Sequence, residues 1–124
     1  MNVLVDTSVW VDHFKNSNTK LRELLNQDNV LSHPMIIGEL ACGTPPMPRT
    51  RTLNNIKLLK MANQASFNEV LGFIERDKIY GMGCGFVDIS LLASALITPD
   101  AMLWTLDKRL SKLAKRYNIS YLNN

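Results

Sequence analysis

Short apolar runs alternate with longer amphipathic stretches along this chain. The first run, 3–5, reads Val-Leu-Val and is typical of a strand buried on both faces, although periodicity alone does not exclude a buried helix. It ends abruptly at Asp6. The next apolar residues are Val9, Trp10 and Phe14, and their spacing predicts a helix that begins directly after the strand.

The remaining pattern continues this alternation. Pro34 suits the first position of one helix, and Ser66 with Glu69 has the spacing of a capping box that opens another. Further predicted helices span 19–27, 52–62, 86–97 and 108–117, and the predicted strands after the first span 30–32, 102–106 and 119–122. Strands that alternate with helices favour an α/β fold in which a short parallel sheet is flanked by helices on both faces.

Length and composition are those of one ordinary globular domain over 1–124. Hydrophobic residues make up 46% and charged residues 20%, which excludes a disordered chain. The longest apolar runs are too short to cross a bilayer, and no export signal precedes the first strand, so we expect a cytoplasmic protein without membrane association. Cys42 and Cys84 lack metal-ligand spacing, and we expect them to be reduced and packed.

Four of the eleven acidic residues lie in apolar segments: Asp6, Glu39, Asp88 and Asp107. Carboxylates are rarely buried without a partner, yet no basic residue lies inside these segments. Two unit charges about 5 Å apart repel by roughly 3 kcal/mol at an effective dielectric near 20. Such a cluster persists if it holds a divalent cation or if some members are protonated.

The α/β arrangement predicts that these four side chains converge. Asp6 and Asp107 each follow a predicted parallel strand, and Asp88 lies in the first turn of a helix after a glycine-rich loop. We expect Glu39, one turn into its helix, to point inward toward them. Ligands that are all oxygen, without His or Cys, favour Mg²⁺ or Mn²⁺ over zinc. The alternative is that the acids are helix caps and buried ion pairs, and for Asp6 alone a capping role is equally compatible with the sequence.

With these residues identified, the chain resembles the PIN-domain ribonucleases and, within them, the VapC toxins of toxin–antitoxin pairs. The matching segments are Val-Leu-Val-Asp6-Thr-Ser8-Val-Trp, Ile-Ile-Gly-Glu39-Leu, Gly-Phe-Val-Asp88-Ile-Ser-Leu-Leu and Leu-Trp-Thr105-Leu-Asp107-Lys-Arg-Leu. Their order and spacing cover essentially the whole chain.

This resemblance implies a PIN fold, Mg²⁺- or Mn²⁺-dependent endonuclease activity on RNA, a homodimer and a cognate antitoxin. Asp6 and Asp88 would be the principal metal ligands, Asp107 would complete the site, and Glu39 would orient a ligand or water. Ser8 and Thr105 would support these carboxylates by hydrogen bonds. The helices after the first two strands, with their excess of apolar residues, are the expected dimer or antitoxin surface.

The formal net charge of +3 is a mild bias, and its distribution is more informative. Basic residues gather in two segments, which is compatible with a polyanionic partner, although solvated helix faces explain each cluster equally well. The expected RNA contacts are Arg49, Arg51, Lys57, Lys60, Lys108 and Arg109.

Other functions fit the sequence less well. A catalytically inactive PIN-like module that binds RNA or a protein partner is the main alternative, and the intact set of four acids disfavours it. A receiver domain would need an Asp at the end of a central strand in the middle of the chain. An Asp-x-Asp phosphatase would need an acid where Ser8 stands. The glycine run 81–85 lacks the spacing of a dinucleotide fingerprint, and we interpret it as a tight turn before Asp88.

Overall fold

The computed structural model describes residues 1–122. A four-stranded parallel sheet with the order β3-β2-β1-β4 forms its centre. The strands are β1 (Asn2–Val5), β2 (Val30–Ser32), β3 (Lys60–Met61) and β4 (Ala101–Trp104). The first strand of the chain therefore lies inside the sheet. It pairs with the last strand in a register that sets Val5 opposite Trp104.

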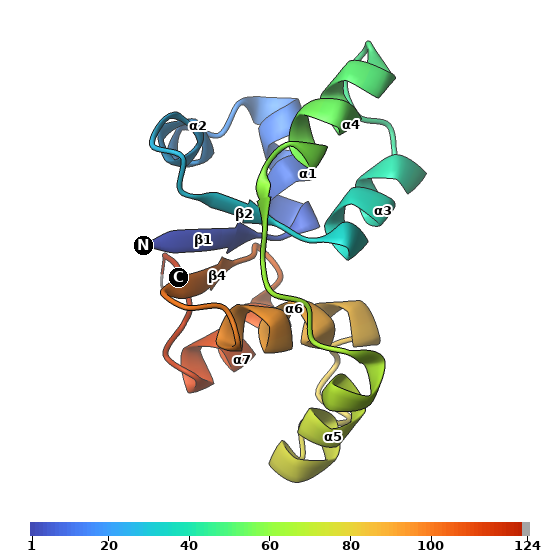
Figure 1. Cartoon of the computed structure of the whole chain (residues 1–124), viewed down its shortest axis with the longest axis vertical. Coiled ribbons are helices and arrows are strands. Elements are labelled where there is room, and N and C mark those ends of the chain that lie inside the picture. Colours follow the sequence, from blue (N-terminus) through green and yellow to red (C-terminus); the bar gives the residue numbers. More distant parts are fainter. Residues whose placement is uncertain (123–124) are drawn as a thin grey trace.

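Helices connect and cover these strands. They are α1 (Thr7–Asn16), α2 (Thr19–Asn26), α3 (Pro34–Cys42), α4 (Arg49–Lys57), α5 (Phe67–Asp77), α6 (Phe86–Leu96) and α7 (Lys108–Arg116). Figure 1 shows α1 to α4 on one side of the sheet and α5 to α7 on the other, which confirms the predicted α/β class. No helix within residues 1–122 has the length and apolar character needed to cross a membrane.

Local capping explains where several helices begin. Ser66 Oγ accepts a hydrogen bond from the Glu69 N–H, and the Glu69 carboxylate accepts one from the Ser66 N–H, which completes the predicted capping box of α5. At α3, Pro34 occupies the first turn and the ring of His33 caps the Met35 N–H. These signals lie within a few residues of each other, so the sequence alone was sufficient to find them.

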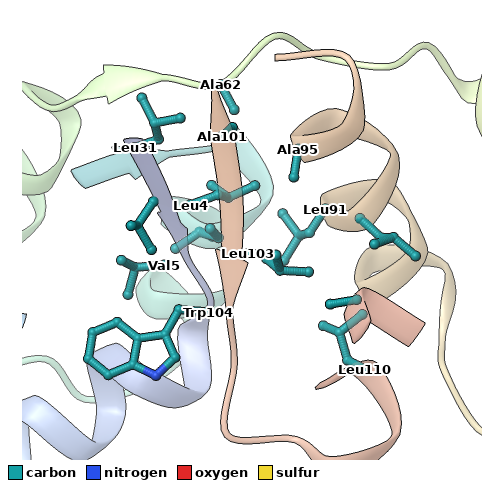
Figure 2. Packing of buried hydrophobic residues seen from close by; sticks show 14 of the residues in the cluster. Leu4, Val5, Leu31, Ala62, Leu91, Ala95, Ala101, Leu103, Trp104 and Leu110 are labelled. Atoms are coloured by element: carbon teal, nitrogen blue, oxygen red, sulfur yellow. The ribbon is translucent and has the colours of Figure 1, made fainter. Parts of the chain in front are cut away.

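The core fills the space between the sheet and the helices. Leu4 and Leu103 from adjacent strands face Leu91 and Ala95 of α6, as Figure 2 shows. Each side chain is fully or almost fully buried. Burying a leucine contributes about 1.5–3 kcal/mol relative to leaving it exposed. β1 and β4 are thereby fixed in place, and so are the residues that directly follow them.

The predicted helix over 52–62 is wrong in its second half. Helix α4 begins earlier, at Arg49, and ends at Lys57, after which the chain forms β3 at the edge of the sheet. In that strand Lys60 pairs with Leu31. The Leu-Leu-Lys-Met stretch has helical propensity, but pairing with a buried strand overrides it.

Three other expectations need correction. The strand predicted over 102–106 ends at Trp104, and the strand predicted over 119–122 is a single bridge between Leu103 and Ser120. Cys42, expected to be packed, is exposed because the buried side of α3 is formed by Ile36 and Leu40. Both cysteines are free thiols, as expected.

Candidate functional site

The paired strands β1 and β4 bring Asp6 and Thr105 together. Because neighbouring parallel strands end at the same edge of a sheet, the residues that follow them become neighbours. The Asp6 N–H donates to the carbonyl oxygen of Trp104 at 2.9 Å, which continues the ladder by one step. The Thr105 hydroxyl then donates to Asp6 Oδ2 at 2.7 Å. The side chain of Asp6 is thus held at the carboxyl edge of the sheet.

Asp6 is a buried carboxylate that does not act as a helix cap. It occupies the N-cap position of α1, but its side chain makes no capping hydrogen bond, so the alternative function as a cap does not hold. Only 6% of the residue is exposed. Its Oδ2 atom accepts from both Thr105 and Ser8, the latter also at 2.7 Å. Within residues 1–122 no hydrogen bond reaches Oδ1, which leaves that oxygen available to a ligand.

The two hydroxyls are themselves oriented by the backbone of the turn between β4 and α7. The Leu106 N–H donates to Ser8 Oγ at 3.0 Å, and the Asp107 N–H donates to Thr105 Oγ1 at 3.0 Å. A hydroxyl has one proton to give, and in each case Asp6 receives it. The turn therefore fixes the direction of both donors before any ligand arrives.

Asp88 lies in the first turn of α6, where the structure brings it near the other three acids. Burial raises the pKa of its carboxyl above the ordinary value. A hydrogen bond from the Gly85 N–H opposes this rise, whereas the charges of Asp6, Asp107 and Glu39 increase it. Mutual repulsion among clustered carboxylates is the behaviour that the sequence led us to expect.

Asp107 has a capping role in addition to its place near Asp88. It is exposed, and its Oδ1 atom accepts from the N–H groups of Arg109 and Leu110 at 2.9 and 3.0 Å, so it caps α7. Its second oxygen accepts no hydrogen bond from the described residues. The capping alternative therefore holds for one oxygen of this acid.

Glu39 does not point inward as expected; it is exposed. With about 100° per residue, it lies roughly 80° around α3 from the centre of the side formed by Ile36 and Leu40. Its Oε1 atom instead accepts a hydrogen bond of 2.7 Å from the hydroxyl of Thr7. Sequence reasoning missed this contact, because the two residues are 32 positions apart in the chain and meet only through the packing of α1 and α3.

The donor set suits a hard divalent cation, although it is not a preformed cage. Within residues 1–122, no three Asp, Glu, His or Cys side chains stand close enough to hold one ion together. Mg²⁺ does not require such a cage, since it is usually bound through one or two carboxylates and keeps several waters. Carboxylate oxygens from Asp6 and Asp88, with no nitrogen or sulfur ligand, match that preference.

The six expected RNA contacts lie in two separate places. Figure 1 shows α4 and α7 on opposite sides of the sheet. On α4, Arg49 donates to the carbonyl oxygens of Ala41 and Gly43, so its guanidinium anchors the end of α3. Arg51, Lys57 and Lys60 are exposed along the same region, whereas Lys108 and Arg109 open α7 directly after Asp107. Of the six, this second pair lies beside the acidic residues.

Comparison with known proteins gives consistent results. The family model of the PIN domain matches residues 3–116. Two curated relatives, both named "Ribonuclease VapC32", come from Mycobacterium tuberculosis strains CDC 1551 / Oshkosh and ATCC 25618 / H37Rv. Each is 40% identical over 108 residues, which cover 87% of this chain and 86% of the relative.

Proposed function

The chain belongs to the PIN-domain family, within its VapC type, and from this membership we propose that it is a divalent-metal-dependent endoribonuclease, the toxin of a toxin–antitoxin pair. The observation that carries the proposal is the carboxyl edge of the sheet, where a buried Asp6 lies near Asp88 and two further acids. Its relatives are named ribonucleases, and this acidic edge is suited to the metal-assisted hydrolysis of phosphodiesters.

Each acid has a proposed part in the site. Asp6 and Asp88 would be the principal ligands of Mg²⁺ or Mn²⁺, and Asp107, which caps α7 with one oxygen, would complete the site. Glu39, fixed by Thr7, orients a ligand or water from the side of α3. When bound, the ion supplies an activated water and neutralises charge on the phosphodiester.

The chain itself prepares this chemistry through position and protonation. Ser8 and Thr105 hold Asp6 in one orientation, so little rearrangement is needed when a cation binds. Because burial raises the pKa of Asp88, this carboxyl takes up a proton at a higher pH than an ordinary aspartate does. Metal binding requires the deprotonated carboxylate, and therefore activity should decline as the pH falls.

RNA, a cognate antitoxin and a second copy of the chain are the proposed partners, and the cytoplasm, where such an RNA would be met, is the proposed location. A pocket of about 350 Å³ between α1 and α3 supports the antitoxin contact, since Thr7 and Glu39 line it together with the apolar Val11, Phe14 and Leu40. An antitoxin segment bound there would lie against the acidic site. A basic side chain on that segment would complement the carboxylates.

The test is cleavage of total cellular RNA by the purified protein with Mg²⁺, Mn²⁺ or chelator. Wild type should give discrete fragments only with metal, and Asp88→Asn should give none. Asp28→Asn is the matched control. Asp28 is exposed and precedes β2, so it lies at the opposite edge of the sheet from the acidic site, and its left-handed backbone conformation (φ 58°) is one that asparagine adopts readily. Failure of folded wild type to cut RNA with either metal would favour the inactive binding module instead.

A further inference from the structure

A cationic cavity adjoins the acidic site between the glycine loop and α7. Its volume is about 560 Å³, within the size range of small-molecule sites. It is lined by Met82, Arg109, Lys112, Leu113, Lys115 and Arg116. Four of these residues are basic and none is acidic, so the cavity is suited to an anionic ligand that also has an apolar part.

Arg109 lies directly against the glycine loop. Gly83 has a φ of +83°, and a Cβ atom there would come within 2.6 Å of Arg109 Cδ and 2.9 Å of its Nε. The arginine side chain therefore packs closely against the backbone of the loop, and a larger residue at position 83 would displace it. The loop thus limits the space open to the arginine side chain on one side of the cavity.

Two of the four cations have unused binding capacity. In the described part of the chain, neither the guanidinium of Arg109 nor the ammonium of Lys112 forms an ion pair or hydrogen bond. They are three residues apart on α7, so they lie on the same side of the helix. Arg116 differs, since it donates to the carbonyl oxygen of Asp77 and lies over the ring of Tyr117.

The cavity is joined to the acidic site through both of its walls. The Arg109 N–H donates to Asp107 Oδ1, and the loop that carries Met82 and Gly83 leads directly into Asp88. A polyanionic strand whose scissile phosphate lies among the carboxylates would therefore meet Arg109 and Lys112 at an adjacent phosphate. Met82 and the floor formed by Leu113 offer apolar contact to a ribose or base.

We propose that this cavity is a nucleotide subsite for the RNA strand next to the scissile phosphate. Arg109 and Lys112 hold the neighbouring phosphate there, and Met82 packs against the nucleoside. The inference rests on the proposed nuclease function and specifies one side of the acidic site as the path of the strand. It also separates the α7 cations from those of α4, which lie across the sheet.

The test measures binding of a fluorescein-labelled single-stranded RNA of mixed sequence by anisotropy, in chelator so that nothing is cut, across a range of salt. The variant is Arg109→Gln with Lys112→Gln. Loss of two phosphate contacts should weaken binding and reduce the slope of log K against log salt by about 1.4, since each contact on a single strand contributes about 0.7. Circular dichroism confirms that each variant is folded.

The matched control is Lys20→Gln with Arg22→Gln on α2. Both double variants lower the formal net charge from +3 to +1, so any general electrostatic effect is the same. The control should retain the wild-type slope. A third variant, Met82→Ser, should weaken binding without changing the slope, because it removes apolar contact and no charge. Met82 is 45% exposed and can be replaced without disturbing the core.

The outcomes test the subsite and the nuclease function independently. An unchanged slope in the α7 double variant, with wild type still cutting RNA when metal is present, would overturn the subsite and leave the nuclease standing. A reduced salt slope in the α7 double variant, with no cleavage by wild type, would support RNA binding in this cavity and contradict the nuclease function. If the double variant instead binds RNA normally but loses affinity for a poly-aspartate peptide, the cavity serves an acidic protein segment and the inference is wrong.

Discussion

At the scale of single residues, the buried carboxylate of Asp6 depends on two hydroxyls and on the turn that orients them. Both Ser8 and Thr105 donate to the same oxygen, Oδ2, and leave Oδ1 without a protein donor. One oxygen of the carboxylate thus holds the side chain in place, and the other is left for the proposed metal ion. Substitutions at the hydroxyls should therefore affect metal binding although neither is proposed as a ligand.

Thr105→Val tests this dependence with little change in shape. The variant removes one donor to Asp6 and leaves the Asp107 N–H without its acceptor, which should lower the free energy of unfolding by about 1–3 kcal/mol. Metal affinity should fall about 10- to 100-fold. Urea denaturation and calorimetric Mg²⁺ titration measure the two effects. Thr52→Val is the control, because that hydroxyl binds the carbonyl oxygen of Pro46 away from the site. Unaltered metal affinity in Thr105→Val would contradict the role of the hydroxyl.

Asp88 should reduce stability at neutral pH. Because its pKa is raised in the folded state, the native protein holds this proton more tightly than the unfolded chain, and stability falls as the pH rises from about 3.8 through the folded pKa. Asp88→Asn should therefore unfold at a higher temperature than wild type at pH 7 without metal, and the difference should shrink toward pH 4. Thermal melts at several pH values measure it. Equal melting temperatures throughout this range would contradict the raised pKa of Asp88 in the folded protein.

At the scale of elements, helix α3 begins on a buried histidine. His33 is 3% exposed, and its Nδ1 atom accepts from the Met35 N–H. The neutral ring therefore carries its proton on Nε2 and donates it to Ser94 Oγ, 3.2 Å away. Burial lowers the pKa of this imidazole, so protonation would place a charge inside the core and remove the cap.

This arrangement predicts a dependence of stability on pH. A lowered folded pKa means that the unfolded chain binds the proton first, so stability should be full above about pH 6.5 and decline as the pH falls from there through the folded pKa. His33→Asn keeps an acceptor at the cap and has no charge to gain. Urea denaturation at pH 7.5 and 5.5 should show a smaller loss in the variant than in wild type. An equal loss would assign the effect to other groups.

The elements also show what the sequence could and could not reveal. Helices α3 and α5 were predictable because Pro34 and the Ser66–Glu69 pair act within one turn. Strand β3 was not, because Lys60 belongs to the sheet only through Leu31, far away in the chain. The same distinction applies to the site: Asp6 was evident as the end of an apolar run, whereas the contact of Glu39 with Thr7 depends on how α1 and α3 pack.

At the scale of the whole molecule, the rigidity of the site derives from the hydrophobic core between the sheet and the helices. Leu103 of β4 is 1% exposed and lies between the sheet and α6. Leu103→Ala should lower the free energy of unfolding by about 2–5 kcal/mol, through lost burial and the cavity left behind. Leu58→Ala is the control, since Leu58 is 85% exposed and its loss should change stability by less than about 0.5 kcal/mol. Chemical denaturation compares the two. Equal effects would contradict the placement of Leu103 in the core.

The strand order has a consequence for the time at which the protein acquires activity. β1 is synthesised well before β4, one of its two neighbours in the sheet, because β2, β3 and six helices lie between them in the chain. The hydroxyl of Thr105, which donates a hydrogen bond to Asp6, lies 99 residues further along the chain. During synthesis, Asp6 is therefore present long before Thr105 can hold its carboxylate in position. The full set of hydrogen bonds that orients Asp6 can therefore form only after β4 and Thr105 have been translated.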